Sequence, residues 1–157
     1  MRYIQYYDTS IGRLGIVQAE DGGVSHILFD KINHGFDDCE VCETPAIAAA
    51  AAQLREYFDR KRRTFDFPMS LRGTDFQKSA WHALTEIPYG ETRSYKQIAE
   101  IIGNPKAVRA VGLANNRNPL PIVIPCHRVV GSDGKLVGYA GGLDVKQYLI
   151  DLEERSD

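Results

Sequence analysis

The sequence has no apolar run long enough to cross a bilayer, and its first residues, Met1–Asp8, lack the apolar core of a secretory signal. Cysteine is scarce, and an odd count of three argues against a disulfide framework. We therefore expect a cytoplasmic protein with no membrane association. The 157 residues are 43% hydrophobic and 25% charged, which is typical of one compact domain or two small lobes.

A strong net charge is also lacking, since the formal value is −2, but the two signs are separated along the chain. Residues 20–43 carry seven acids and one base, whereas residues 91–130 carry six bases and two acids. A basic half can bind a polyanion such as nucleic acid on one face. Ordinary scatter of surface charge is the alternative interpretation.

The first part of the chain predicts a small antiparallel sheet and one helix. Residues 2–30 read as strands around a hairpin turn at Asp21-Gly22-Gly23, because glycine supplies the positive φ of tight turns. Thr44 and Pro45 predict a helix start, followed by an alanine-rich run to Arg60. Residues 64–68 alternate like a short edge strand, and a linker follows, so we expect domains at 1–70 and 71–157.

Two cysteines, Cys39 and Cys42, form a Cys-x-x-Cys pattern in an acidic segment predicted to be a loop. Such a pair is half of a tetrahedral zinc site. A second pair is needed, and only His26 and His34 are near in sequence. We favour two incidental thiols over a weak metal site, and we expect no bound metal.

The second part of the chain predicts helices. Thr74 and Ser94 are N-cap residues for helices at 75–86 and 95–102, and Gly103 closes the second of these. A third helix is predicted at 106–115, and it forms a helix-turn-helix pattern with its predecessor. By itself this pattern is weak evidence for nucleic-acid binding, because short helix pairs are common.

The segment from Pro121 to Val130 is the strongest chemical signal. Its apolar start predicts a buried strand, which Pro125 must interrupt because proline has no N–H for a sheet ladder. Cys126, His127 and Arg128 follow directly, so a thiol lies beside a possible base and a permanent cation. This is how a reactive cysteine is built. A small buried cysteine beside a satisfied histidine is an equally good interpretation of these residues alone.

Together these motifs resemble the O6-alkylguanine-DNA alkyltransferases, also called methylated-DNA–protein-cysteine methyltransferases. The resemblance is close from Gly73 to Glu153 and loose in the first lobe. The motifs that carry it are Ile87–Tyr95, Gly103–Gly112, Asn118–Val130 and Gly138–Leu143.

The resemblance implies an α+β protein. Its N-terminal lobe would be a ribonuclease-H-like sheet with a helix and a structural role. Its C-terminal lobe would be mostly helical, with a helix-turn-helix for DNA binding and the alkyl acceptor. It also implies DNA repair by direct reversal, in which a suicide enzyme transfers the O6-alkyl group of a flipped guanine to its own cysteine. No cofactor is implied, and we expect a monomer bound to the minor groove of double-stranded DNA.

The resemblance also implies residue roles. Cys126 is implied as the alkyl acceptor, His127 as its base through a bound water, and Glu153 as the carboxylate that orients the histidine. Asn118 would brace the active segment, and Tyr95 would bond guanine N3. Arg128 is expected in a structural or phosphate-side ion pair. The expected DNA-binding residues are Asn104, Lys106, Arg109 (as an arginine finger), Ala110, Asn115, Arg117 and Tyr95, and the expected pocket residues are Val129, Tyr139, Ala140, Gly141 and Lys146.

One departure is Ala140, which stands where some family members have serine. Because the implied donor to guanine O6 is its backbone N–H, little binding of the guanine should be lost.

Two other functions stay open. A helix-turn-helix sensor would bind alkylated DNA without transfer, and a Cys–His hydrolase would turn over esters or amides. The hydrolase leaves Arg109 without a use.

Overall fold

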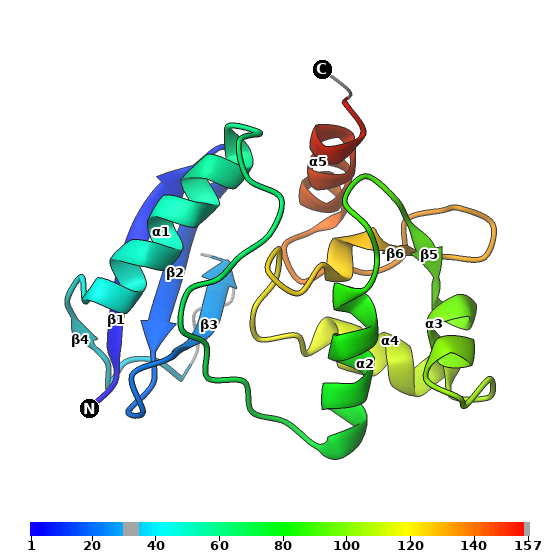
Figure 1. The fold of residues 1–157 in the computed structure, drawn as a ribbon, viewed down its shortest axis with the longest axis horizontal. Coiled ribbons are helices and arrows are strands. Elements are labelled where there is room, and N and C mark those ends of the chain that lie inside the picture. Colours follow the sequence, from blue (N-terminus) through cyan, green and yellow to red (C-terminus); the bar gives the residue numbers. More distant parts are fainter. Residues whose placement is uncertain (30–34, 156–157) are drawn as a thin grey trace. The chain divides into compact units, whose positions relative to one another are not determined.

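The computed structural model describes residues 1–29 and 35–155 of the chain. These divide into two compact units, Met1–Arg72 and Gly73–Asp157, which are described separately. Figure 1 shows a sheet and helix in the first unit and mostly helices in the second. The predicted mixed α+β fold is therefore confirmed. No helix among the described residues is long and apolar enough to cross a membrane.

The first unit is built on a four-stranded sheet of order β3-β2-β1-β4. The first three strands form the predicted antiparallel meander. The fourth pairs with β1 in parallel, in a segment that the sequence predicted to be a loop. It lies between the two cysteines predicted to be in a loop, where backbone N–H groups find acceptors along the open edge of β1. The strands are β1 Tyr3–Thr9, β2 Gly12–Gln18, β3 Val24–Phe29 and β4 Glu40–Val41.

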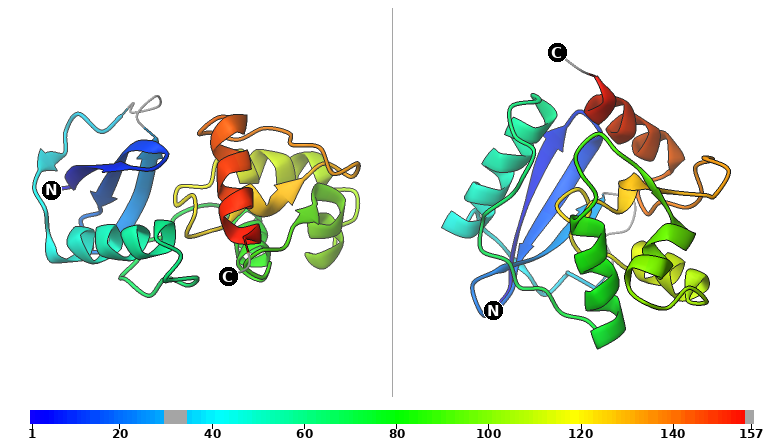
Figure 2. Two further views of the ribbon diagram at one scale, coloured as in Figure 1. Left: turned by 90° about the horizontal axis from the view of Figure 1, so that it is seen from above. Right: turned by 45° about the vertical axis from the view of Figure 1, so that its right-hand side comes forward.

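Helix α1, Pro45–Phe58, packs on one face of this sheet, as the left view in Figure 2 shows. Thr44 is its N-cap and accepts a hydrogen bond from the N–H of Ile47 at 3.2 Å. Leu54 and Tyr57 are buried on its inner side. The helix ends before the predicted position, because Arg60 takes a left-handed conformation with φ 63°.

The edge strand predicted at 64–68 does not form. Instead, the chain makes an isolated bridge between Val24 and Met69 beside β3. The N–H of Val24 donates to Pro68 at 2.9 Å, and the N–H of Ser70 returns a bond to Val24 at 2.9 Å. Gly23 permits this approach, since an added Cβ would lie 2.7 Å from the Met69 backbone. Close backbone contact at a glycine therefore decides the local structure here.

The second unit begins with helix α2, which opens with a capping box. The Thr74 hydroxyl accepts from the N–H of Gln77, and the Gln77 side chain accepts from the N–H of Thr74. Trp81 and Leu84 are buried on its inner face. The remaining elements form a helix pair, a two-stranded ladder and a last helix. In chain order, the helices and strands of this unit are α2 Asp75–Thr85, β5 Arg93–Ser94, α3 Tyr95–Ile101, α4 Val108–Asn116, β6 Val129–Val130 and α5 Leu143–Glu154.

Helices α3 and α4 form the predicted helix-turn-helix pair, which is green to yellow in Figure 1. Ser94 caps α3, and Gly103 makes the turn with φ 82°. Helix α4 starts later than predicted, at Val108, and has no side-chain cap. Lys106 therefore lies in the exposed turn before α4 and not on the helix. The Asn104-Pro105 pair favours a turn here, which delays the helix.

Candidate functional site

The apolar run before Cys126 is buried but is not the predicted strand. Ile122 has φ 75°, and Pro121 and Ile124 make an isolated bridge, so the chain turns sharply on itself. Cys126–Arg128 then forms a single 3₁₀ turn, η2, before β6 pairs with β5 in parallel. Because no strand forms here, there is no ladder for Pro125 to interrupt, and Pro125 instead lies directly before η2. The thiol is thus presented from a tight turn between two constrained segments.

Two asparagines brace this turn. The Asn118 side chain donates to the Ile124 carbonyl at 2.7 Å and accepts from the N–H of Leu120 at 2.9 Å. The Asn115 side chain donates to the Cys126 carbonyl at 3.3 Å. Asn115 is only 4% exposed, so its predicted place on a DNA-facing surface is wrong. Its position on the inner face of α4, beside Val111 and Ala114, is what buries it.

Cys126 is buried, with 4% of its surface exposed. Burial raises the pKa of its thiol to about 11, and a hydrogen bond with Asn118 and the positive charge of Lys146 oppose that rise only partly. The thiol is therefore almost wholly protonated at neutral pH. Reaction as a nucleophile requires a base that removes the proton when substrate is bound.

His127 lies next to the thiol in the chain and is completely buried. Its Nε2 lies 2.6 Å from Oε2 of Glu153, which comes from the last turn of α5. Burial lowers the pKa of His127, although Glu153 opposes this effect, so the ring is neutral at neutral pH. A neutral ring that donates from Nε2 carries its lone pair on Nδ1. That Nδ1 has no hydrogen-bond partner among the described residues, so it is free to accept a proton.

Arg128 also binds Glu153. Its Nε donates to Oε1 at 2.7 Å and its Nη2 to Oε2 at 3.0 Å, while its Nη1 donates to the Ile87 carbonyl at 2.8 Å. Burial works against the charge on Glu153, but hydrogen bonds from His127 and Arg128 hold the pKa of its carboxyl at about 2. Of the two expected roles for Arg128, the geometry is that of a buried structural ion pair. Arg128 is 7% exposed, and its guanidinium is occupied by protein acceptors.

The predicted pocket residues lie on β6, on α5 and in the segment 131–142 that joins them. Besides the larger effect of burial, electrostatic interaction with Cys126 acts to raise the pKa values of Tyr95, Tyr139 and Lys146, so these three groups would respond to ionisation of the thiol. Burial raises the pKa of Tyr95, and it raises that of Tyr139 well above the ordinary range. Val129 and Gly141 are buried, and Ala140 is exposed. The site therefore combines the thiol with two phenols and an ammonium that interact with it electrostatically.

Among the other predicted DNA-binding residues, Tyr95 is half-buried and the rest are exposed in or beside α4. Arg109 and Ala110 are on the outer side of α4, Asn104 and Lys106 are in the turn before it, and Arg117 follows its last residue. Sequence reasoning missed two exposed apolar side chains of this helix, Val108 at 37% and Leu113 at 52%. Both lie outside the stripe of buried residues formed by Val111 and Ala114, and this spacing could have indicated that they are exposed.

Two family models match the chain. The model described as 6-O-methylguanine DNA methyltransferase, ribonuclease-like domain, matches residues 2–71, and the one described as its DNA binding domain matches residues 75–155. The chain belongs to this family. A methylated-DNA–protein-cysteine methyltransferase from Methanosarcina barkeri is 65% identical over 161 residues, which cover 96% of this chain and 98% of the relative. One from Bacillus subtilis is 44% identical, with 99% and 98% covered.

Solved structures of the family agree with this membership. The O6-methylguanine methyltransferase of Mycobacterium tuberculosis has a TM-score of 0.89 and 42% identity, covering 98% of this chain and 93% of its own. The structure of Mycobacterium tuberculosis OGT in complex with DNA has a TM-score of 0.88 and 42% identity, with 97% and 92% covered. The family fold therefore extends over both units of this chain.

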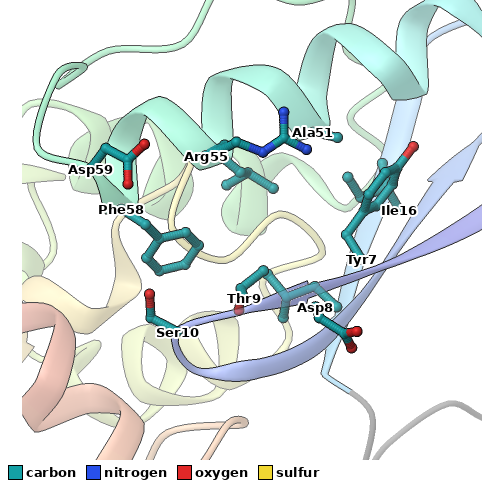
Figure 3. A pocket seen from close by; sticks show the side chains of 11 residues that line it. Tyr7, Asp8, Thr9, Ser10, Ile16, Ala51, Arg55, Phe58 and Asp59 are labelled. Carbon is teal, nitrogen blue, oxygen red and sulfur yellow. The ribbon is translucent and has the colours of Figure 1, made fainter.

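The first unit of this methyltransferase-family protein contains a separate pocket of about 220 Å³. Figure 3 shows the Arg55 and Phe58 side chains of α1 facing Tyr7, Thr9 and Ser10 of the first hairpin across it. Its lining contains no cysteine or histidine, so it offers no thiol or imidazole for the chemistry described above.

The Cys-x-x-Cys pair consists of free thiols, Cys39 half-buried and Cys42 exposed. No group of three or more potential metal ligands occurs within residues 1–29 and 35–155. His26 is half-buried, bonded to Ser25 at 2.9 Å and packed edge-on against Phe36. His34, the other histidine considered for a metal site, lies outside the described residues.

Proposed function

We propose that this protein repairs DNA by moving the alkyl group from O6 of a guanine to Sγ of Cys126. The S–C bond forms as the C–O6 bond breaks, and the proton that leaves the thiol balances the one the departing guanine takes up. The product thioether is stable, so each molecule reacts once and needs no cofactor. Membership of the family supports the reaction class. The observation that carries the assignment to this site is the His127–Glu153 contact of 2.6 Å, which leaves Nδ1 unpartnered.

In this proposal His127 is the base and Glu153 orients it. Glu153 accepts from Nε2, which fixes the tautomer with its lone pair on Nδ1. That nitrogen takes the thiol proton through one bound water, because the pKa of the buried thiol is too high for spontaneous ionisation at neutral pH. Asn118 and Asn115 keep the turn rigid, so that the nucleophile loses little entropy on reaching the alkyl carbon.

The DNA side of the proposal uses α4. A thiol cannot reach O6 within a stacked duplex, so the base must be flipped out of it. Arg109 would enter from the minor groove and hold the space that the base leaves, with Ala110 allowing close approach. Asn104, Lys106 and Arg117 would contact the flanking backbone. The exposure of all five side chains, in α4 and at its two ends, supports this arrangement.

Within the pocket, the flipped guanine would be held mainly by backbone groups. We propose the carbonyls of Cys126 and Val129 as acceptors for its exocyclic amine and the N–H of Ala140 as a donor to O6. Tyr139 and Gly141 would line the alkyl side. The Tyr95 hydroxyl would donate to N3 and so help the guanine leave. Such a site reads hydrogen-bonding edges and tolerates different alkyl groups.

We further propose that residues 1–70 are a structural domain, that residues 71–157 bind DNA and accept the alkyl group, and that the protein acts as a monomer. The compact units at Met1–Arg72 and Gly73–Asp157 support this division. Gel filtration with light scattering tests the monomer, alone and with a duplex containing one O6-methylguanine.

The central experiment uses a duplex whose O6-methylguanine carries a radiolabelled methyl group. Wild-type protein should take up one label per molecule, and peptide mapping should find it on Cys126. Cys126→Ser should take up none, whereas Cys42→Ser, a matched exposed cysteine, should react normally. Absence of transfer by folded wild type, with tight lesion binding, would favour the non-transferring sensor. Multiple turnover of an ester or amide would favour the hydrolase.

A further inference from the structure

The carbonyl of Val137 accepts hydrogen bonds from two side chains on different helices. The hydroxyl of Tyr95, at the start of α3, donates to it at 2.8 Å. Nζ of Lys146, on α5, donates to it at 3.1 Å and to the Gly138 carbonyl at 3.1 Å. The segment 131–142, drawn in orange between β6 and α5 in Figure 1, is therefore attached to both helices at one point.

Lys146 is buried where it makes these two hydrogen bonds. None of its surface is exposed, and no carboxylate pairs with it among the described residues. A buried ammonium without acceptors is strongly unfavourable, so the two carbonyls are what keep its charge inside the protein. Burial lowers the pKa of Lys146 to about 8, while the nearby Cys126 opposes that effect. At neutral pH the side chain is still mostly cationic and close to the nucleophile.

Tyr95 has only one hydroxyl hydrogen to donate. In the structure that hydrogen bonds to Val137, whereas in the proposed function it bonds to guanine N3. Binding of the flipped base must therefore exchange one acceptor for the other. Once Tyr95 has left Val137, Lys146 is the one of these two side chains that still bonds to the Val137 carbonyl.

We propose that Lys146 is a positioning residue for alkyl transfer: it anchors the Val137–Gly138 carbonyls, so that Tyr95 can exchange Val137 for the guanine without releasing the wall of the pocket. The inference rests on the proposed function for the role of Tyr95. In the free protein, the proposal requires that either Tyr95 or Lys146 alone is enough to hold the segment 131–142. When the base is bound, the proposal requires that Lys146 alone holds the segment.

Backbone hydrogen exchange can test this redundancy, because the segment contains internal reporters. The N–H of Gly131 bonds to Lys135 at 2.9 Å, and the N–H of Gly142 bonds to Tyr139 at 3.0 Å. All proteins would carry Cys126→Ser, so that the complex with an O6-methylguanine duplex is stable. The variants are Lys146→Met, Tyr95→Phe and the double variant. Lys135→Met, an exposed lysine of the same segment, is the matched control.

In the free protein, the Gly131 and Gly142 amides of each single variant should exchange at nearly the parent rate. In the double variant they should exchange about tenfold faster, since a hydrogen bond to a charged group contributes on that scale. On the lesion duplex, Lys146→Met alone should exchange about tenfold faster than the parent in the same complex. Lys146→Arg should restore protection, and Lys135→Met should match the parent throughout. If Lys146→Met does not fold, Lys146→Gln replaces it; its amide can still donate to one of the carbonyls, so a smaller increase in exchange is expected in the complex.

Kinetics in the Cys126 protein give an independent readout. Lys146→Met should lower the maximal single-turnover rate about tenfold or more without changing the duplex concentration that gives half of that rate. Equal deprotection by Lys146→Met in free and bound protein would overturn the proposal, because it indicates a general structural role. So would unchanged exchange in the double variant. Failure of wild-type transfer would refute the proposed function separately, whatever the exchange rates of the free protein.

Discussion

Arg128 and Glu153 form a buried, two-pronged ion pair, with Nε to Oε1 at 2.7 Å and Nη2 to Oε2 at 3.0 Å. The pair joins the 3₁₀ turn of the thiol to the last turn of α5. It also determines how Glu153 acts on His127, because a carboxylate neutralised by a guanidinium pulls less on an imidazole proton. Burial is the main reason that the pKa of His127 is lowered, and the charge of Arg128 adds to this effect, so the ring stays neutral and available as a base.

Replacing Arg128 with methionine should destabilise the protein by about 3–5 kcal/mol, because Glu153 is left as an uncompensated buried charge. Urea unfolding followed by circular dichroism measures this change. Arg62→Met is the matched control, since Arg62 pairs with Glu56 on the surface. That exposed pair should contribute at most about 1 kcal/mol. Equal losses in the two variants would contradict the importance of burial.

Acid should weaken the fold through Glu153. The pKa of its carboxyl is about 2 in the folded protein, below the ordinary 4.5, so the unfolded chain binds the proton more readily. Its contribution is therefore complete above about pH 5 and is lost as pH falls towards 2, with a size of up to about 3 kcal/mol. Urea unfolding at a series of pH values measures the slope. Glu153→Gln should flatten it, and an unchanged slope would argue against this assignment.

Removal of the His127 side chain should slow transfer without weakening DNA binding. We expect His127→Gln to lower the single-turnover rate about 10²-fold or more, because the base is lost while α4 is untouched. Rapid-quench measurements with labelled duplex give the rate, and fluorescence anisotropy gives the affinity. His82→Gln, on the exposed side of α2, is the control. A similar fall in affinity would assign His127 to folding of the site.

The free protein should protect Cys126 from general alkylation. Its thiol pKa is raised from 9 to about 11. The fraction of thiolate is therefore about a hundredfold lower than for an unperturbed thiol, and burial adds a steric barrier. Iodoacetamide at pH 7.5 should modify exposed Cys42 well before Cys126, as peptide mass spectrometry can measure. Lesion-specific reaction combined with this inertness would show that substrate binding activates the thiol. Equal modification would contradict the buried site.

Arg109 should affect the rate of alkyl transfer from duplex DNA but not from a free base. Arg109→Ala should lower the transfer rate from a duplex about tenfold or more, since nothing holds the space left by the flipped guanine. It should leave reaction with the free base O6-benzylguanine unchanged, because that ligand needs no flipping. Lys78→Ala, an exposed lysine of α2, is the control. A loss of both activities would assign Arg109 to the fold.

The elements with strong local signals were predictable from the sequence. Capping residues such as Thr44, Thr74 and Ser94 fix helix starts through short-range hydrogen bonds that the residue types reveal. The turn at Asp21-Gly22-Gly23 and the antiparallel meander around it follow from the same kind of local chemistry. The motif residues around Cys126 identified the family before any geometry was known.

The errors arose where distant contacts override local pattern. Ile122 belongs to a residue type that favours strands, yet it takes φ 75° in a turn held by Asn118 and flanked by prolines. The strand at Glu40–Val41 exists because the edge of β1 was open. Asn115 looked like a surface amide, and only the packing of α4 shows that it points inward. None of these contacts leaves a mark in the adjacent sequence.

The sequence contains a single tryptophan, and the indole N–H of Trp81 donates to the Ala114 carbonyl of α4 at 2.9 Å. Trp81 is 2% exposed and lies where α2 supports α4, the helix that the proposed function places against DNA. The protein therefore carries its own optical probe, and no label is needed. A change in the polarity or hydrogen bonding of this indole will shift its emission, so fluorescence can follow the engagement of α4 with DNA in real time.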